Sequence, residues 1–498
     1  MSIQRQQNST NLPRFVPKPF AGQATLHNPD SAGPGPKGAS GTGWLSVLAP
    51  ADIALPAYLV VAIVLGGGGS PSPLPEMVLE WMALALLAGL VLLKSGDRAW
   101  PRWAIGFALA LMALPAVQLI PLPPAVWQAL PGREIEAAAL DLVGAGQKWM
   151  PWTLSPPRTL ASLLALIVPA VALVAAALAS PRGRTFALVT IVAMALVSTV
   201  IGMGQLAGGP HSALRFYAFS HREDLIGFQA NRNAQADVLL AGLLALAALA
   251  FGHPARLRQG GAIASAAAAL LLAGALVLTA SRAGIALLVL ATLAAMLALG
   301  RSLRTRVSGR AWLVIGTGAL VTVASLAWAV ATNPVLARIG GRFKFGSETR
   351  PDIWQDTLFA IAQTWPWGSG IGTFGPVFVA AERLEAVNLS LPNRAHDDFL
   401  ELALEAGAPG VVMLVVLVGL LAWRGVIGWR SDPAPRHRAS LYFAAAVLAM
   451  LGLHSIVDYP LRSMALAALG GIAGGFILAP ARHRGDAIRS GRVETKQP

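Results

Sequence analysis

The fold class is decided by residues 261–300, GAIASAAAALLLAGALVLTASRAGIALLVLATLAAMLALG, in which Arg282 is the only charged side chain. A bilayer core about 30 Å thick is crossed by about 20 predominantly apolar residues in a helix. The stretch is therefore long enough for two membrane-spanning helices, with Arg282 in the short turn between them. We expect an all-α polytopic membrane protein.

The composition of the whole chain supports this class. Of 498 residues, 55% are hydrophobic and 12% are charged, whereas a soluble globular protein has about 25% charged residues. The absence of cysteine excludes disulfides, cysteine nucleophiles and thiolate metal sites. The formal charge is +14, but the basic residues lie between apolar segments instead of forming a patch, which argues against nucleic acid as a partner.

Apolar windows predict twelve membrane spans. They lie at 50–66, 77–93, 103–120, 159–179, 185–206, 234–252, 261–279, 283–300, 311–331, 409–429, 438–456 and 461–479. Alanine and glycine are frequent in these windows, which favours close packing of helices. Lysine and arginine fall preferentially in the tails and the even-numbered connections, and such residues stay on the cytoplasmic side. We therefore expect both termini to be cytoplasmic.

The organisation outside the spans is uneven. Residues 1–43 predict a disordered cytoplasmic tail, 44–480 a transmembrane domain and 481–498 a cytoplasmic C-terminal tail. The outer loops are long, at 121–158, 207–233 and 332–408, and long ordered loops tend to carry function.

The largest loop, 332–408, is expected to contain two short helices. In the first, at 351–365, the apolar residues Trp354, Leu358, Ile361 and Trp365 recur at helical spacing, as in a helix lying along a membrane surface. The second is expected to begin with Asn393 as its N-cap and to stop at Gly407 and Pro409, where the next span starts.

Four clusters of polar residues lie at the outer ends of predicted spans or in this loop. Charged groups near membrane depth are costly unless they are paired or hydrated, so they are candidates for function. The clusters are Arg282; Asn231, Arg232 and Asn233; Arg394, His396, Asp397, Asp398 and Glu401; and His454, Asp458 and Arg462. Each cluster also has a structural interpretation, namely a snorkelling arginine, a helix cap, a solvated helix face and an ion pair.

The residue types in these clusters suit phosphate binding and proton transfer. An arginine between two amides can hold a phosphate through several N–H donors, although Asp237, one turn later, is positioned to pair with Arg232. A histidine among carboxylates, such as His396, can act as a base. On a continuous helix His454, Asp458 and Arg462, at i, i+4 and i+8, would lie on one face, although a kink at Pro460 before Arg462 is the alternative.

Three other features of the longest loop lead to different expectations. Arg350, with Arg338, Arg342 and Lys344, adds positive charge that attracts anionic lipids or a phosphate. Gly370, Gly372 and Gly375 spell G-x-G-x-x-G, but they lie in a loop without a βαβ unit, so a dinucleotide site is not expected. Asn388 matches a glycosylation sequon, a pattern too short to decide anything.

Several segments together resemble the bacterial O-antigen ligase and polymerase family of polytopic glycosyltransferases that act on lipid-linked glycans. The segments are QLIPLPPAVWQALPGR (118–133), FQANRN (228–233), TASRAG (279–284), RPDIWQDTLFAIAQTWPWGSGIGTFGPVF (350–378), NRAHDDFLELALEAGAPG (393–410) and HSIVDYPLR (454–462). The chain departs from the family's usual pattern at Ala234, where a histidine is common, and at Asp397, where an asparagine is frequent.

The resemblance implies a reaction at the periplasmic face of the bacterial inner membrane. Arg232 and Arg282 would bind the diphosphate of an undecaprenyl-diphosphate-linked glycan, and His396 would assist the acceptor hydroxyl. Other residues are expected to bind substrate or to assist Arg232, Arg282 and His396. They are Arg350, Arg394, Asp397, Asp398, Glu401, His454, Asp458 and Arg462. We expect a single displacement, which inverts the configuration at C1 of the sugar. Because guanidinium groups would stabilise the leaving diphosphate, we expect no metal or other cofactor.

The sequence leaves several alternatives open. The acceptor could be a lipid A core sugar, as for a ligase, another lipid-linked repeat unit, as for an O-antigen, capsule or exopolysaccharide polymerase, or a protein hydroxyl. A lipid-linked glycan transporter and a scaffold without chemistry are further alternatives. Transporters place polar residues at the membrane midplane within repeated, broken helices, whereas here the polar residues lie at the outer ends of spans, which favours an enzyme.

Overall fold

A computed structural model describes residues 50–68, 73–93, 99–218, 220–255, 261–332, 350–387 and 391–480. The chain divides into two units, Met1–Val47 and Leu48–Pro498, and all described residues lie in the second. The expected tails at 1–43 and 481–498 lie outside the described residues, as do the sequon at Asn388 and the basic residues Arg338, Arg342 and Lys344.

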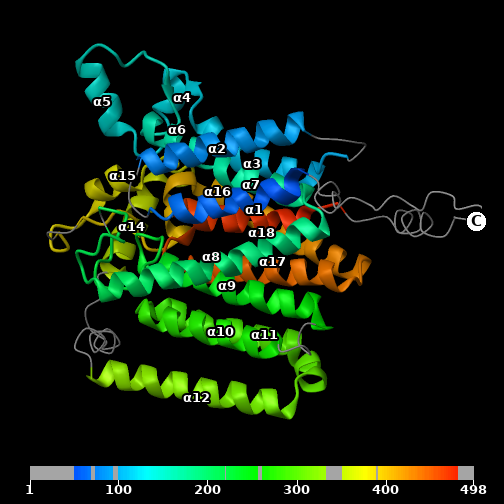
Figure 1. Ribbon diagram of the computed structural model, residues 1–498. Helices are drawn as coiled ribbons and strands as arrows, with labels where there is room; N and C mark the ends of the chain where they lie inside the picture. Colours follow the sequence, from blue (N-terminus) through cyan, green and yellow to red (C-terminus); the bar gives the residue numbers. More distant parts are fainter. Residues whose placement is uncertain are drawn as a thin grey trace, which may run out of the picture. The chain divides into compact units, whose positions relative to one another are not determined.

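The described residues are predominantly helical, as expected for an all-α protein (Figure 1). The helices are α1 (Pro50–Leu65), α2 (Pro73–Leu92), α3 (Arg102–Gln118), α4 (Pro124–Trp127), α5 (Glu134–Leu142), α6 (Pro156–Ala165), α7 (Ile167–Leu178), α8 (Pro181–Ala207), α9 (Arg232–Gly252), α10 (Gly261–Leu278), α11 (Arg282–Arg306), α12 (Gly309–Thr332), α14 (Arg350–Thr364), α15 (Phe374–Ala381), α16 (Asp398–Ser431), α17 (Pro435–His454), the 3₁₀ helix η3 (Pro460–Arg462) and α18 (Met464–Leu478). Two short strands, β1 (Pro121–Leu122) and β2 (Met150–Pro151), pair antiparallel, with Pro121 opposite Pro151 and Leu122 opposite Met150.

All twelve predicted windows coincide with helices. Seven described segments are long and apolar enough to cross a membrane: Leu74–Leu92, Pro156–Leu178, Pro181–Ala207, Arg232–Gly252, Gly261–Leu278, Arg282–Gly300 and Asp398–Ser431. Shorter apolar helices are Pro50–Leu65, Arg102–Gln118, Gly309–Ser325 and Met464–Leu478. The membrane character is therefore confirmed, whereas the count of twelve spans stays a prediction.

The core is formed by tightly packed helices that are rich in small residues. A Cβ added at Gly471 of α18 would lie 2.4 Å from the carbonyl oxygen of Pro169 in α7, and one added at Gly475 would lie 2.3 Å from that of Leu173. Helices approach this closely only where a side chain is missing. The core contains the fully buried side chains of Phe443 in α17 and Phe476 in α18.

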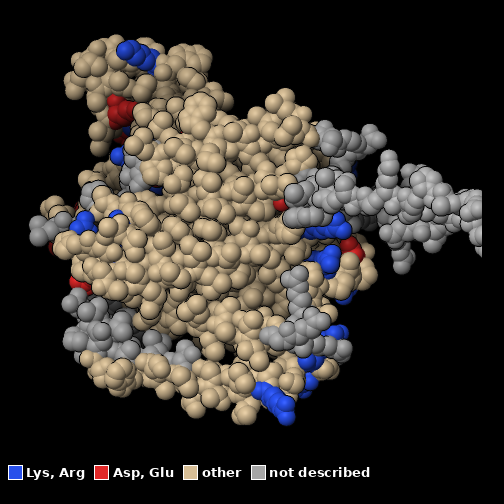
Figure 2. Space-filling view, viewed as in Figure 1, with Lys and Arg blue, Asp and Glu red and all other residues tan. Residues whose placement is uncertain are grey.

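The outer surface of the bundle is apolar. Large hydrophobic side chains such as Trp81, Leu297 and Val415 are more than half exposed, which in water would be an aggregation hazard. Figure 2 shows a broad band free of charged side chains, with Lys, Arg, Asp and Glu gathered toward the two ends of the helices. This distribution is the one that a bilayer requires.

The first helix of the longest loop is confirmed as α14, whereas its placement along the membrane surface stays a prediction. α14 buries Ile353, Thr357, Ala360 and Thr364, whereas Leu358 is 55% exposed and Trp365 47% exposed. The buried side of α14 packs against Phe374 and Phe378 of α15 and Leu404 of α16. The exposed positions of Leu358 and Trp365 leave these side chains available to a membrane surface.

The second helix begins later than expected, and the predicted N-cap at Asn393 is wrong. The cap is Asp397, whose side chain accepts hydrogen bonds from the backbone N–H groups of Phe399 and Leu400 at 2.8 and 2.9 Å. A carboxylate here satisfies two donors that the helix itself leaves unpaired. Residues 391–397 therefore approach α16 as non-helical chain.

The predicted stop at Gly407 corresponds to a break inside α16. Gly407 has φ of +57° and ψ of −155°, a backbone conformation that residues other than glycine rarely adopt. The turn after α14 supplies partners at the break: Ser369 N donates to Leu404 O at 2.9 Å, Gly370 N to Glu405 O at 2.8 Å, and Ala408 N to Pro366 O at 2.8 Å. α16 is thus a short helix over 398–406 followed by a long apolar one.

Candidate functional site

His396 occupies an unusual backbone position directly before α16. Its φ is +52°, a left-handed conformation that costs a non-glycine residue about 1–2 kcal/mol. The preceding residue is fixed on both sides, because Trp354 Nε1 donates to Ala395 O at 3.0 Å and Ala395 N donates to Glu401 Oε2 at 3.1 Å. This anchoring directs the His396 ring toward Asp458, with 3.1 Å between Nδ1 and Oδ1.

Asp458 connects the loop histidine with the start of α9. Its second oxygen, Oδ2, accepts a hydrogen bond from Asn233 Nδ2 at 2.6 Å. Burial opposes ionisation of Asp458, but the hydrogen bond from His396, together with the neighbouring His454, holds its pKa below the ordinary value. Asp458 is therefore an ionised carboxylate that orients both His396 and Asn233.

The expected helix face carrying His454, Asp458 and Arg462 was wrong. α17 ends at His454, where Val457 N and Asp458 N both donate to His454 O, and Arg462 lies in η3 beyond Pro460. The turn nevertheless keeps His454 Nε2 within 4.0 Å of Asp458 Oδ2. The proline ends the regular helix, as its missing N–H requires.

Arg232 is the first residue of α9. Its N-cap, Asn231, accepts a hydrogen bond from Asn233 N at 2.8 Å. The guanidinium Nη1 lies 3.1 Å from Asp224 Oδ2, and the side chain is 23% exposed. One edge of the guanidinium is thus held by the carboxylate of Asp224, in the preceding loop.

The expected pairing of Arg232 with Asp237 was wrong. Asp237 instead accepts from His454 Nδ1, at 2.7 Å to Oδ1 and 2.8 Å to Oδ2, and both side chains are fully buried. Five residues separate Arg232 from Asp237, so in a helix with 3.6 residues per turn they point in different directions. Sequence analysis missed this buried pair, which joins α9 to α17.

Arg282 is the first residue of α11, with Ser281 as the N-cap that accepts from Gly284 N at 3.0 Å. A Cβ added at Gly284 would lie 2.6 Å from Cβ of Ala236 in α9. The N-terminal ends of α9 and α11 are therefore in close contact, and each begins with an arginine. Helix N-termini carry partial positive charge, which adds to that of the guanidinium groups.

A separate group of charges surrounds Arg462. Its Nη2 lies 3.1 Å from Glu401 Oε1 and 2.9 Å from Glu405 Oε2, and its Nε lies 3.7 Å from Asp398 Oδ1. Burial opposes the charge of Arg462, but the three carboxylates outweigh it and raise its pKa above the ordinary value. Arg394 Nη1 pairs with Glu401 Oε1 at 2.8 Å.

These contacts separate the predicted site residues into two groups. Asp398 and Glu401 engage arginines, and Asp398 also accepts from Ser455 Oγ at 2.9 Å, so neither is hydrogen-bonded to His396. Asp397 serves as the helix cap, and burial raises its pKa. Glu405 and Asp224 were not predicted: Glu405 pairs with Arg462, 57 residues away, and Asp224 pairs with Arg232 through the fold of the loop before α9.

Arg350 and the glycine-rich turn complete the surroundings of the site. Arg350 begins α14 within electrostatic range of His454. Gly370 and Gly372 have φ of +111° and +90°, and Cβ atoms there would lie 2.0 Å from Thr153 Oγ1 and 2.6 Å from Ser162 Oγ. The glycines therefore allow the turn to dock onto the first outer loop, a packing role. Within the described ranges no three His, Asp or Glu side chains form a group that could hold a metal ion.

Residues 267–415 match the family model described as O-antigen ligase. Over this segment the chain is similar to the O-antigen ligase family. The matched segment contains Arg282, Arg394 and His396, which confirms the resemblance found in the sequence. No curated protein matches the chain.

Members of the O-antigen ligase family are glycosyltransferase-like membrane enzymes of the ligase or polymerase type, and the chain is similar to them over the matched segment. Lipid-linked glycans and acceptors are the general partners of such enzymes. Arg232 and Asp458 lie outside the segment that matches the O-antigen ligase model. Asp458 contacts both Asn233 and His396, and Arg232 directly precedes Asn233 in the chain.

Proposed function

We propose that the protein transfers a glycan from undecaprenyl diphosphate to an acceptor hydroxyl at the periplasmic face of the bacterial inner membrane. The observation that carries the proposal is the hydrogen-bonded series from His396 through Asp458 to Asn233, the neighbour of Arg232. This series supports a common site for a candidate base, His396, and a candidate phosphate ligand, Arg232. The apolar outer surface of the bundle suits a donor with a long lipid tail.

In the proposed reaction, His396 is the base. Because Asp458 is ionised, His396 Nδ1–H donates to it, and the lone pair of Nε2 remains available for the acceptor hydroxyl. As Nε2 takes the proton, the acceptor oxygen forms a bond to C1 of the donor sugar. The bond between C1 and the phosphate oxygen breaks, and its electron pair leaves with the diphosphate. A single displacement of this kind inverts the configuration at C1.

Arg232 and Arg282 are proposed to bind the leaving diphosphate. A guanidinium offers several N–H donors in a plane that matches phosphate oxygens. Charge stabilisation at the point where charge develops is among the largest contributions to catalysis. Asp224 holds Arg232 on one face, which limits its motion and leaves the remaining donors for substrate. Two guanidinium groups would thus perform the role that a divalent cation has in other sugar transferases.

The remaining charged residues are proposed to shape the site. Arg394 and Arg350 would assist the phosphates, while Arg462 with Asp398, Glu401 and Glu405 fixes the short helix that follows His396. Fixing this helix keeps the strained His396 backbone in place. Asp237 and His454 lie behind Asp458 and would hold the carboxylate in position.

The site suits a transferase better than a transporter. The chemistry-bearing side chains gather at the beginnings of α9, α11 and α16 and at the end of α17, whereas transporters place them within broken helices at the midplane. Ligase and polymerase both need the same donor site and differ in the acceptor. We favour a ligase in lipopolysaccharide or surface polysaccharide synthesis, with the polymerase as the alternative.

Glycan transfer by the purified protein in proteoliposomes tests the proposal. The assay supplies an undecaprenyl-diphosphate-linked glycan and an acceptor, and compares the native protein with His396→Ala. We expect a loss of about 10²- to 10⁴-fold, as for removal of a general base. Full transfer by His396→Ala would contradict the mechanism. In a deletion strain, long unlinked chains on the carrier would indicate a ligase, and single repeat units a polymerase.

A further inference from the structure

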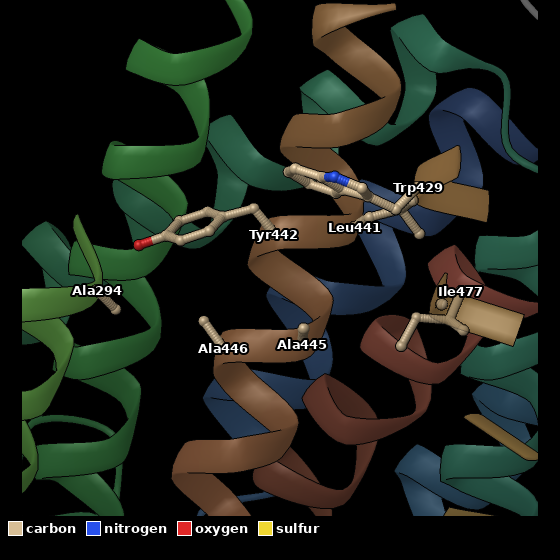
Figure 3. Close-up of a pocket in the computed structure, with 8 residues that line it drawn as sticks. Ala294, Trp429, Leu441, Tyr442, Ala445, Ala446 and Ile477 are labelled. Carbon is tan, nitrogen blue, oxygen red and sulfur yellow. The ribbon is translucent and has the colours of Figure 1, made fainter. Parts of the chain in front are cut away.

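A groove lies on the membrane-facing surface far from His396, near the end of α16 and the start of α17. It has a volume of about 390 Å³ and is bounded by α11, α16, α17 and α18. Its lining consists of Ala294, Gly425, Trp429, Leu441, Tyr442, Ala445, Ala446 and Ile477. In Figure 3, Trp429 and Tyr442 lie at one end of the groove, and Ala445 and Ala446 lie one turn further along α17. Small side chains on three helices thus leave an apolar channel between larger neighbours.

Polar atoms lie at the end of the groove marked by Trp429. Three buried polar atoms here, Tyr442 Oη, His437 Nε2 and Arg438 Nε, have no hydrogen-bond partner among the described residues. Arg438 Cζ lies 5.2 Å from the centre of the Trp429 ring, and His437 Nε2 lies near Gly428 of α16. Buried polar atoms without partners are costly and call for a ligand or a water molecule.

The charge around this end is positive. Arg430, Arg436 and Arg438 lie on or beside the connection between α16 and α17, and none of them takes part in an ion pair of the described residues. The nearby carboxylate of Asp432 accepts a hydrogen bond from Ala434 N at 2.9 Å. Figure 2 shows basic side chains gathered at the ends of the helices on one side of the bundle. By the predicted topology, this end faces the cytoplasm.

We infer that this groove binds an anionic phospholipid of the inner leaflet. One acyl chain fills the channel along Ala445, Ala446 and Ala294, and the phosphate lies against Arg438 and His437. The Tyr442 hydroxyl donates to an ester or phosphate oxygen. An apolar channel that ends in basic groups suits a lipid better than a soluble anion, because only the lipid uses both parts. The undecaprenyl diphosphate donor is placed at the opposite end of the helices.

Native mass spectrometry of the purified full-length protein in detergent tests the inference. Phosphatidylglycerol and phosphatidylcholine with identical acyl chains are titrated separately. We expect phosphatidylglycerol to bind more tightly, and Arg438→Gln to weaken its binding about fivefold, as for loss of one basic residue beside an anionic headgroup. Ala446→Trp fills the channel and is expected to weaken binding of both lipids at least tenfold.

Matched variants separate this groove from general effects. Arg310→Gln removes an exposed arginine near the start of α12, and Ala422→Trp adds an indole on the exposed side of α16; both should leave binding unchanged. Ala446→Leu replaces Ala446→Trp if the larger side chain prevents folding. Four results would overturn the inference. The two lipids could bind equally, or the channel-filling variant could bind them as the native protein does. Inorganic phosphate could compete as well as phosphatidylglycerol does, or the protein could selectively retain undecaprenyl phosphate. Because glycan transfer is not the readout, the outcome is independent of the proposed function.

Discussion

The side chain that connects the two halves of the site is Asp458. It is hydrogen-bonded to both His396 and Asn233, and in the proposed reaction it contacts neither the acceptor hydroxyl nor the donor diphosphate. Partners that orient a functional histidine typically contribute a factor of about 10–100. The proposed mechanism therefore depends on a residue that does not itself meet the substrate.

Replacing Asp458→Asn keeps the shape of the side chain and removes its charge. The amide no longer selects the His396 tautomer with its proton on Nδ1, so we expect kcat for glycan transfer to fall by about 10- to 100-fold with little change in KM for the donor. Steady-state kinetics in proteoliposomes measure both constants. Asp352→Asn is the control, because Asp352, on α14, is exposed and pairs with Arg383. A larger effect on KM than on kcat would assign Asp458 to donor binding.

The lowered pKa of Asp458 also predicts how stability depends on pH. A carboxyl whose pKa is lowered on folding stabilises the native state above its unfolded value, here 3.8, and loses this contribution as the pH falls through the lower native value. The Tm of the native protein in detergent should therefore exceed that of Asp458→Asn by a constant amount at pH 5–7, an interval about one unit or more above the unfolded value. The difference should shrink at lower pH. A difference that grows on acidification would contradict this assignment.

Arginine and lysine variants distinguish phosphate binding from snorkelling at Arg282. Arg282→Lys keeps the charge but loses the planar set of donors, so we expect a rise in donor KM or a fall in kcat of at least tenfold, about 1.4 kcal/mol. The same substitution at Arg222, an exposed residue of the loop before α9, is the control. Unchanged kinetics for Arg282→Lys would show that this arginine only anchors the helix end.

At the scale of elements, the break in α16 positions the residues that follow His396. A Cβ at Gly407 would lie 2.2 Å from Pro366 O, in a backbone conformation with φ of +57°. Gly407→Ala should therefore destabilise the protein by about 1–3 kcal/mol. Gly419→Ala is a matched control in the same helix, because nothing lies within 4 Å of its added Cβ and alanine stabilises a helix interior by about 0.5–1 kcal/mol. In thermal unfolding in detergent, we expect the Tm of Gly407→Ala to lie below that of the native protein and the Tm of Gly419→Ala to lie above it.

Apolar length predicted every long helix, because a helix that crosses a bilayer must be apolar along its whole length. The residue types of the site, including Arg232, Arg282 and His396, could be selected because charges at membrane depth are costly. The pairings could not, since Asn233 and Asp458 are 225 residues apart and Asp237 and His454 are 217 apart. Such contacts depend on how α9 and α17 pack, which hydrophobic spacing does not determine.

For the whole molecule, the absence of cysteine makes the topology easy to test. Single variants Ala213→Cys, in the loop before α9, and Ser431→Cys, at the end of α16, place exposed thiols at opposite ends of the helices. A membrane-impermeant maleimide added to intact spheroplasts should label Ala213→Cys and leave Ser431→Cys unlabelled until the membrane is opened. The reverse pattern would place the site in the cytoplasm and contradict the periplasmic reaction.

The joint at Gly407 gives the whole molecule a mechanical property. Membrane-spanning helices tilt as the surrounding bilayer thickens or thins, and an unbroken helix would transmit that tilt to its ends. Here the turn at 366–370 bonds to Leu404 and Glu405 before the break and to Ala408 after it. We therefore expect a change in tilt of the long apolar half to be taken up at Gly407, so that the segment carrying His396 keeps its position in bilayers of different thickness.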